Sequence, residues 1–202
     1  MISHCKKFIH IHITRCAGSS IDNSLGQYSI TKTSRDSLYE MFSERHIKAV
    51  CVENYKNYFK FAIVRNPWDR MVSIFHWGKQ IPKNKIAQWS ERNFEPWLNG
   101  GAWKKAVRSE KNEVLIPTHG ELMLDWVTDN DGKIAVDYIG RQENMDEAWK
   151  VISSAIGIEY QKLPREHGTK RYGNYRSYYN NNSRKIVEDY FEKDIAFFDY
   201  KF

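Results

Sequence analysis

A short stretch near the start of the chain, residues 8–20, constrains the fold more than any other. It has the sequence FIHIHITRCAGSS, and its first part, from Phe8 to Ile13, is rich in β-branched residues and followed at once by small turn-forming residues. A run of this length and composition is typical of a buried β-strand. Ile21 and Leu25 then continue at helical spacing. The stretch therefore predicts a strand, a tight loop and a short helix in direct succession.

The loop and the start of the helix have the features of a phosphate site. Ala17 and Gly18 let the backbone turn tightly and approach a ligand closely. Ser19 and Ser20 follow where we expect the helix to begin, and their hydroxyls can cap it and share an anion with its free amides. Arg15 adds a positive charge. The Walker pattern G-x-x-x-x-G-K-[ST] is absent, which disfavours an ordinary ATPase. A plain strand-to-helix connection explains the same residues equally well.

A second strand-to-helix junction follows in residues 59–77, with the sequence FKFAIVRNPWDRMVSIFHW. Residues 59–64 predict another buried strand, because the run is apolar on both faces. Asn66 can cap the next helix, and Pro67 fits its first position, where no backbone N–H is needed. Strands that alternate with helices predict an α/β fold in a single domain, with a central, mostly parallel sheet flanked by helices.

The junction also carries a candidate anion site. Arg65 stands at the end of the predicted strand, and Ser73 lies about two turns into the helix, so the two side chains can converge on one anion. The spacing alone favours a simpler interpretation. In that interpretation Ser73 is a hydroxyl on the helix surface, and Arg65 forms an ion pair with Asp69.

The later segments predict further elements and a basic, aromatic loop. We expect a strand over residues 136–139, a helix that Asn144 caps in a capping box, and a last helix that begins at Ser183. Residues 162–179 interleave basic residues with tyrosines, a combination that suits a nucleobase and a phosphate. Residues 78–120 are rich in Trp and Lys. They form either a sugar-binding surface or a helical insert whose aromatic residues are core.

The size and charge of the chain restrict its function less than these motifs do. The chain has 202 residues, which suits one domain, and its formal net charge of +6 suits an anionic partner. Nucleic acid, a nucleotide, a sulfated or uronic sugar and a membrane surface all meet that description. Three cysteines without a C-x-x-C pair argue against a disulfide framework and a structural zinc site. No apolar run approaches the length of a membrane span, and little sequence precedes the first strand, so we expect a cytoplasmic protein.

Taken together, these residues resemble the sulfotransferase family 2 domain, whose members include the carbohydrate and heparan sulfate sulfotransferases. The resemblance rests on four motifs in the family's order: a 5′-phosphosulfate loop, an RNPWDR…S segment, an IGR-x-EN segment and a DI-x-x-F-x-Y-x-F ending. These motifs occupy residues 8–20, 59–73, 137–144 and 194–202. The match covers nearly all of residues 1–202 and is weakest within 78–120. It implies a P-loop-like α/β fold, 3′-phosphoadenosine-5′-phosphosulfate (PAPS) as the co-substrate, and no metal.

The resemblance also implies roles for individual residues. It assigns the 5′-phosphosulfate to a run of consecutive loop residues: Arg15, Cys16, Ala17, Gly18, Ser19 and Ser20. It assigns the 3′-phosphate to Arg65 and Ser73. Lys170 and Arg171 become candidate contacts in a loop that closes over the nucleotide. His46 lies where related enzymes often place the histidine that takes the proton of the acceptor hydroxyl, so the implied catalytic residues are His46 and the loop arginine.

The loop departs from the family at a position that matters. The family pattern is Pro-Lys-Thr-Gly/Ala-Gly-Thr-Ser, whereas this chain has Thr-Arg-Cys-Ala-Gly-Ser-Ser from Thr14 to Ser20. Arg15 keeps the charge of the family lysine, but its planar guanidinium is not equivalent to a compact ammonium. The resemblance implies sulfuryl transfer to an acceptor hydroxyl, most simply that of a carbohydrate. His76 and His119 are further candidates to face the acceptor, and the oligomeric state stays open.

Three other functions remain open on the sequence alone. A P-loop-type nucleotide kinase would bind ATP with magnesium, although the missing Walker lysine argues against it. A nucleic-acid-binding module would use the basic, tyrosine-rich loop and bind with a steep salt dependence, although the resemblance gives no reason to expect nucleic acid. A catalytically impaired family member would bind the nucleotide without transferring the sulfuryl group, and Arg15 is the reason to consider it.

Overall fold

The computed structural model describes residues 1–28, 55–80, 93–104, 107–108, 115–116, 120–164 and 173–202. The chain divides into two compact units, each of which has its own interior. The first unit comprises Met1–Arg65 and Met123–His167, and the second comprises Asn66–Leu122 and Gly168–Phe202.

The first unit is built on a four-stranded sheet with the strand order β1-β2-β3-β6. The strands are β1 (Ile2–Ser3), β2 (Phe8–Ile11), β3 (Phe59–Val64) and β6 (Tyr138–Arg141). β1 runs antiparallel to β2, whereas β2, β3 and β6 are parallel, with Phe8 opposite Phe59 and Phe61 opposite Tyr138. The carboxyl ends of the three parallel strands therefore share one edge, which is where α/β folds bind their ligands.

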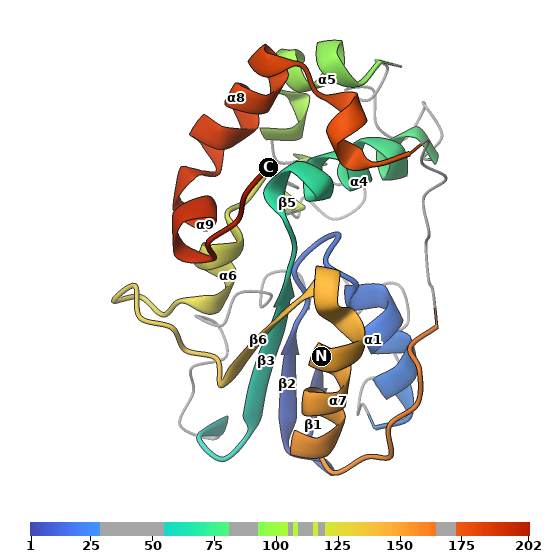
Figure 1. Ribbon diagram of the computed structural model, residues 1–202. Helices are drawn as coiled ribbons and strands as arrows, with labels where there is room; N and C mark the ends of the chain where they lie inside the picture. Colours follow the sequence, from blue (N-terminus) through green and yellow to red (C-terminus); the bar gives the residue numbers. More distant parts are fainter. Residues whose placement is uncertain (29–54, 81–92, 105–106, 109–114, 117–119, 165–172) are drawn as a thin grey trace. The chain divides into compact units, whose positions relative to one another are not determined.

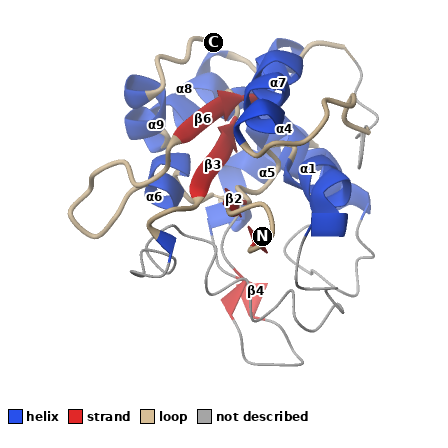
Figure 2. Ribbon diagram, turned by 90° about the horizontal axis from the view of Figure 1, so that it is seen from below, coloured by secondary structure: helices blue, strands red, loops and turns tan. Residues whose placement is uncertain are grey.

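Helices cover both faces of this sheet. Helices α1 (Gly18–Leu25) and α7 (Met145–Ala155) lie on one side of it, and α6 (Met123–Val127) lies on the other (Figure 1 and Figure 2). Two short 3-10 helices, η1 (Gly26–Tyr28) and η5 (Gln142–Asn144), complete the described secondary structure of the unit. All of β2 and the last four residues of β3 are buried, as strands covered on both faces must be. The predicted α/β fold with a mostly parallel sheet flanked by helices is confirmed.

Three predicted details of the first unit are wrong. The first strand ends at Ile11, because the amide of Ile13 donates to the carbonyl of Ile11 and begins the turn there. The strand expected from residue 136 begins at Tyr138, where its pairing with β3 starts. The side chain of Asn144 makes no capping bond to α7, because η5 leads directly into that helix.

The second unit is largely helical. Its elements are α4 (Pro67–Gln80), α5 (Phe94–Gly100), η4 (Ala102–Lys104), the antiparallel pair β4 (Val107–Arg108) and β5 (Leu115–Ile116), η6 (Tyr175–Tyr178), α8 (Asn181–Tyr190) and α9 (Glu192–Phe197). The rings of Phe75, Phe94 and Trp97 contact one another with centroids 5.3 to 5.8 Å apart. These aromatic residues of the predicted insert and of α4 are core. The expected location of the insert near the acceptor stays a prediction.

Side-chain caps fix where two helices of this unit begin. Asn66 caps α4 as predicted, because its Oδ1 accepts hydrogen bonds from the amides of Trp68 and Asp69, at 3.1 and 3.4 Å. The helix predicted to begin at Ser183 begins earlier, at Asn181, because Asn180 caps α8 and forms a capping box with Ser183. It was expected to be the last helix, but it ends at Tyr190 and α9 follows as a separate helix. None of the helices in the described parts of the chain combines the length and apolar character that a membrane span requires.

Candidate functional site

The candidate site lies at the carboxyl edge of the sheet in the first unit. The loop that follows β2 and leads into α1 contains Arg15, and Arg65 follows directly after β3. Because β2 and β3 are adjacent and parallel, both segments leave the sheet at the same edge. Two regions that are fifty residues apart in sequence thus meet where a phosphate group is expected.

The backbone of the loop is strained in a way that favours an anion. Arg15 and Ala17 both have φ near 63°, in the left-handed region that residues with a Cβ adopt at a cost of about 1–3 kcal/mol each. Ala17 is the N-cap of α1, and Gly18 is its first residue. A left-handed residue followed by a helical one turns successive amides toward one side, which makes a concave anion site at the positive end of the helix.

The predicted capping by serine is wrong. No side chain caps α1, and the helix begins at Gly18, so Ser19 and Ser20 lie within its first turn. The amide of Ser20 donates to the carbonyl of Ala17 at 3.1 Å. The tight turn is made by the left-handed conformation of Ala17, whereas Gly18 packs against the ring of His12.

Arg65 is fixed against this loop. Its side chain is only 4% exposed, and Nη1 donates to the carbonyl of Arg15 at 3.0 Å. Its backbone amide donates to the sulfur of Met123 at 3.4 Å. The structure therefore places the guanidinium of Arg65 against the backbone of this loop.

Cys16 faces the interior of the unit. It is 1% exposed, and its thiol donates to the carbonyl of Thr14 at 3.6 Å and lies 3.9 Å from the sulfur of Met123. Its amide donates to the carbonyl of Ile13. The side chain therefore packs beneath the loop, as a small residue in a tight turn does.

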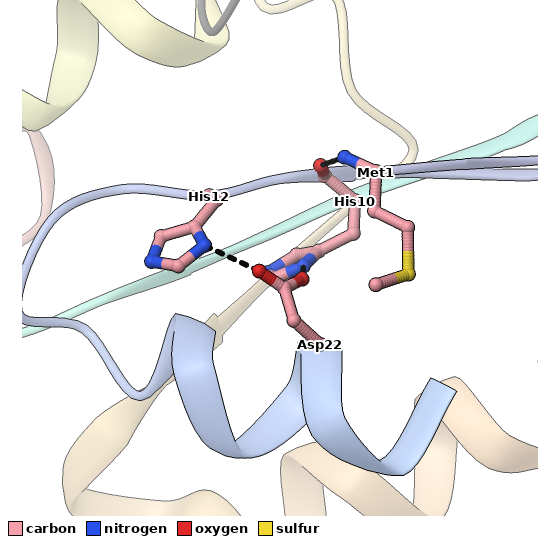
Figure 3. Close-up of polar contacts among 4 residues, drawn as sticks. All are labelled: Met1, His10, His12 and Asp22. Atoms are coloured by element: carbon pink, nitrogen blue, oxygen red, sulfur yellow. Dashed lines mark hydrogen bonds and ion pairs between the residues drawn. The ribbon is translucent and has the colours of Figure 1, made fainter. Parts of the chain in front are cut away.

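Two histidines and an aspartate form a cluster beside the loop that the sequence analysis missed (Figure 3). Asp22 of α1 accepts a hydrogen bond from Nδ1 of His10 at 2.8 Å and another, on its second oxygen, from Nδ1 of His12 at 2.6 Å. The side chain of His10 is 1% exposed, whereas those of His12 and Asp22 are each 30% exposed. The sequence does show that the two histidines share a face, because residues two apart on a strand point to the same side of the sheet.

Burial and hydrogen bonding set the charges in this cluster. Burial lowers the pKa of His10 to about 4, although Asp22 acts in the opposite direction, so His10 is neutral at pH 7. Burial alone would raise the pKa of Asp22, but the charges and hydrogen bonds of the two histidines hold that pKa well below its usual range. The cluster therefore contains an ionised carboxylate, which can only accept hydrogen bonds from the two imidazoles.

Gly18 makes room for the ring of His12. A Cβ at Gly18 would lie 2.3 Å from both Cδ2 and Nε2 of that ring. We predict that Gly18→Ala lowers the free energy of unfolding by about 1–3 kcal/mol, because the ring or the helix must move. Gly26→Ala is a matched control just beyond α1, where nothing lies within 4 Å of an added Cβ. Urea unfolding of the two variants measures the difference, and equal stability would contradict the predicted contact.

The other predicted site residues are divided between the second unit and the undescribed segments. Ser73 lies on α4 in the second unit and is 1% exposed, so its interpretation as a hydroxyl on the helix surface is wrong. His76 is in the same unit, where its Nε2 lies 2.8 Å from the hydroxyl of Tyr178. The remaining predicted residues lie outside the described residues: His46, His119, Lys170 and Arg171. Within the described residues, no cluster of three or more histidine, cysteine or acidic side chains is arranged to hold a metal ion.

Comparison with known proteins gives the family of the chain. The model of the sulfotransferase family matches residues 1–201, which is essentially the full sequence. Searches of curated proteins and of solved structures gave no significant match. The family match agrees with the strand, tight loop and helix at the sheet edge and with the arginine that follows the neighbouring strand. The chain belongs to the sulfotransferase family.

Proposed function

We propose that this sulfotransferase uses PAPS as its donor and transfers the sulfuryl group to the hydroxyl of a sugar or glycan. The observation that carries the proposal is the hydrogen bond of 3.0 Å from the guanidinium of Arg65 to the carbonyl of Arg15. It joins two cationic residues at one strained loop, beside the first amides of α1. A donor with phosphate groups at both ends of an adenosine needs such cationic contacts at separate points.

The residue roles follow from this proposal. The amides of Ala17, Gly18 and Ser19 and the side chains of Arg15 and Ser20 would hold the 5′-phosphosulfate, since the amide of Ser20 already donates to the carbonyl of Ala17. Arg65 and Ser73 would hold the 3′-phosphate, and the basic loop with Lys170 and Arg171 would contact the nucleotide.

The reaction is an in-line displacement at sulfur. The acceptor oxygen forms the new S–O bond while the bond from sulfur to the bridging phosphate oxygen breaks, and the electron pair of that bond stays on the phosphate. Arg15 and the loop amides stabilise the charge that develops on this leaving group. A base takes the proton of the acceptor hydroxyl, and by family resemblance His46 is a candidate for that role.

Calorimetric titration with the desulfated product, 3′-phosphoadenosine-5′-phosphate (PAP), tests the donor site. We expect Arg65→Ala to weaken binding about 10- to 100-fold, because a charge-assisted hydrogen bond contributes about 1.5–3 kcal/mol. Lys150→Ala is the matched control, since it removes one positive charge from an exposed ion pair on α7. No binding by the wild type, or equal binding by Arg65→Ala, would rule out the assigned site.

A further inference from the structure

The geometry of the Asp22 carboxylate fixes the protonation of His12. Both carboxylate oxygens are engaged, one by each imidazole, and both contacts use Nδ1. Because the carboxylate is ionised and only accepts, the hydrogen on His12 must sit on Nδ1 whenever that ring is neutral. The other nitrogen, Nε2, then carries a lone pair and can accept a proton.

The position of Nε2 is at the donor loop. The Nε2 atom would lie 2.3 Å from a Cβ on Gly18, which places it directly over the first residue of α1. The side chain of His12 is 30% exposed, and no described residue forms a hydrogen bond with Nε2. A proton-accepting nitrogen is thus available beside the amides that the proposed function assigns to the phosphosulfate.

His10 holds the carboxylate in this orientation. Its ring lies between two others, with centroids 5.0 Å from Phe61 and 5.7 Å from His12. Its carbonyl accepts a hydrogen bond from the amino group of Met1 at 2.9 Å. The rings on either side restrict how far the buried imidazole can turn, and its Nδ1 occupies one oxygen of Asp22. The second oxygen is left facing His12.

We infer that Asp22, held by His10, is a positioning residue that fixes His12 with Nε2 toward the donor loop, where His12 accepts the proton of the acceptor hydroxyl. The inference rests on the proposed function. In the step, the acceptor O–H bond breaks as the new S–O bond forms, and the proton moves to Nε2. The imidazolium that results is stabilised by the carboxylate of Asp22, as an acid–base pair of this kind requires.

Three substitutions separate the roles. In His12→Asn the side-chain amide can still donate to Asp22, but no basic nitrogen remains. Asp22→Asn removes the carboxylate charge and the preference for one tautomer. His46→Ala removes the alternative base. Turnover is measured with ³⁵S-labelled PAPS, using unsulfated heparosan polysaccharide and water as the acceptor probes, and PAP affinity and thermal unfolding are measured on every variant.

We expect His12→Asn to lower kcat about 100-fold or more while PAP affinity changes less than about twofold. Asp22→Asn should lower kcat at least tenfold, because the ring of His12 loses the carboxylate that fixes its tautomer and stabilises the imidazolium. The groups that face His12 in this region are Asp22 from α1 and His10 from β2. Retained turnover in His12→Asn, with loss in His46→Ala, overturns the inference. An unchanged kcat in Asp22→Asn overturns the positioning role. If His12→Asn fails to fold, His12→Gln takes its place.

A second measurement needs neither donor nor acceptor. Long-range ¹⁵N–¹H spectra of the histidine rings report which nitrogen carries the hydrogen. We expect His12 in the wild type to be protonated on Nδ1, and Asp22→Asn to shift it toward the Nε2-protonated form. A wild-type ring already protonated on Nε2 overturns the inference even if PAP binds. Absence of PAP binding with the Nδ1-protonated ring present would instead overturn the proposed function, and with it the base role of His12, while the positioning of His12 by Asp22 would stand.

Discussion

Arg15→Ala is expected to lower kcat about 100- to 1000-fold while PAP still binds. The charge on the leaving phosphate develops in the transition state, and loss of one well-placed donor for such a charge costs about this much. The change is a clean truncation, because Ala tolerates the left-handed φ of this position no better than Arg does. It also keeps the backbone carbonyl to which Arg65 donates. Initial rates with labelled PAPS at saturating acceptor measure the effect.

Arg15→Lys is the matched comparison, because it restores the residue that the family pattern has at this position. If the wild type transfers the sulfuryl group, we expect the lysine variant to keep most of the rate that the alanine variant loses. If the wild type has no turnover and the lysine variant gains it, the chain is a catalytically impaired member of its family. Equal rates for Arg15→Ala and the wild type would remove the arginine from the catalytic machinery.

The free energy of unfolding is expected to fall by about 3 kcal/mol as the pH drops from 6.5 to 4. Burial lowers the pKa of His10 from 6.5 to about 4. Between these values the unfolded chain binds a proton that the folded chain does not, so stability decreases at about 1.4 kcal/mol per pH unit. Above pH 6.5 the imidazole is neutral in both states and contributes no slope. The depressed pKa of Asp22 adds a further loss at lower pH, below the value of an unfolded carboxyl.

Denaturant unfolding between pH 7.5 and 4.5 measures this slope. His10→Asn keeps a donor to Asp22 near the position of Nδ1 but cannot bind a proton. Its free energy of unfolding should therefore depend less steeply on pH, by the contribution of one proton. His4→Asn is the control, because it removes an exposed histidine of the same unit. A wild-type stability that does not change over this range would show that His10 is not buried as described, and so would a slope that His10→Asn leaves intact.

The sequence predicts the layout of the first unit because that layout depends on local patterns. A β-branched apolar run followed by small residues specifies a strand and a turn, and an Asn before a Pro specifies the start of α4. The left-handed conformation of Ala17 could not be predicted in this way. Nothing in an alanine favours φ near 63°. In the structure the carbonyl of Ala17 accepts hydrogen bonds from the amides of Ser20 and Ile21 of the following helix.

The histidine cluster was missed for a related reason. The spacing of His10 and His12 predicts that both side chains lie on the same face of the strand. Their common hydrogen-bond acceptor, Asp22, lies on the following helix. Whether Asp22 reaches both rings depends on how α1 packs against β2, which side-chain spacing alone does not determine. The role of Gly18 is similar, because the residue was expected to approach a ligand and instead makes room for the ring of His12.

The strained loop, the two imidazoles and the carboxylate all fall within residues 8–22, in one continuous strand–turn–helix segment. Contacts between residues so near in sequence close with little loss of chain entropy, so this corner can assemble early and independently of the order in which distant strands join the sheet. The short spacing between these residues also makes the segment intolerant of changes in length. Inserting or deleting a single residue between Gly18 and Asp22 of α1 would rotate the position of Asp22 about the helix axis by about 100° and turn the carboxylate away from both rings at once.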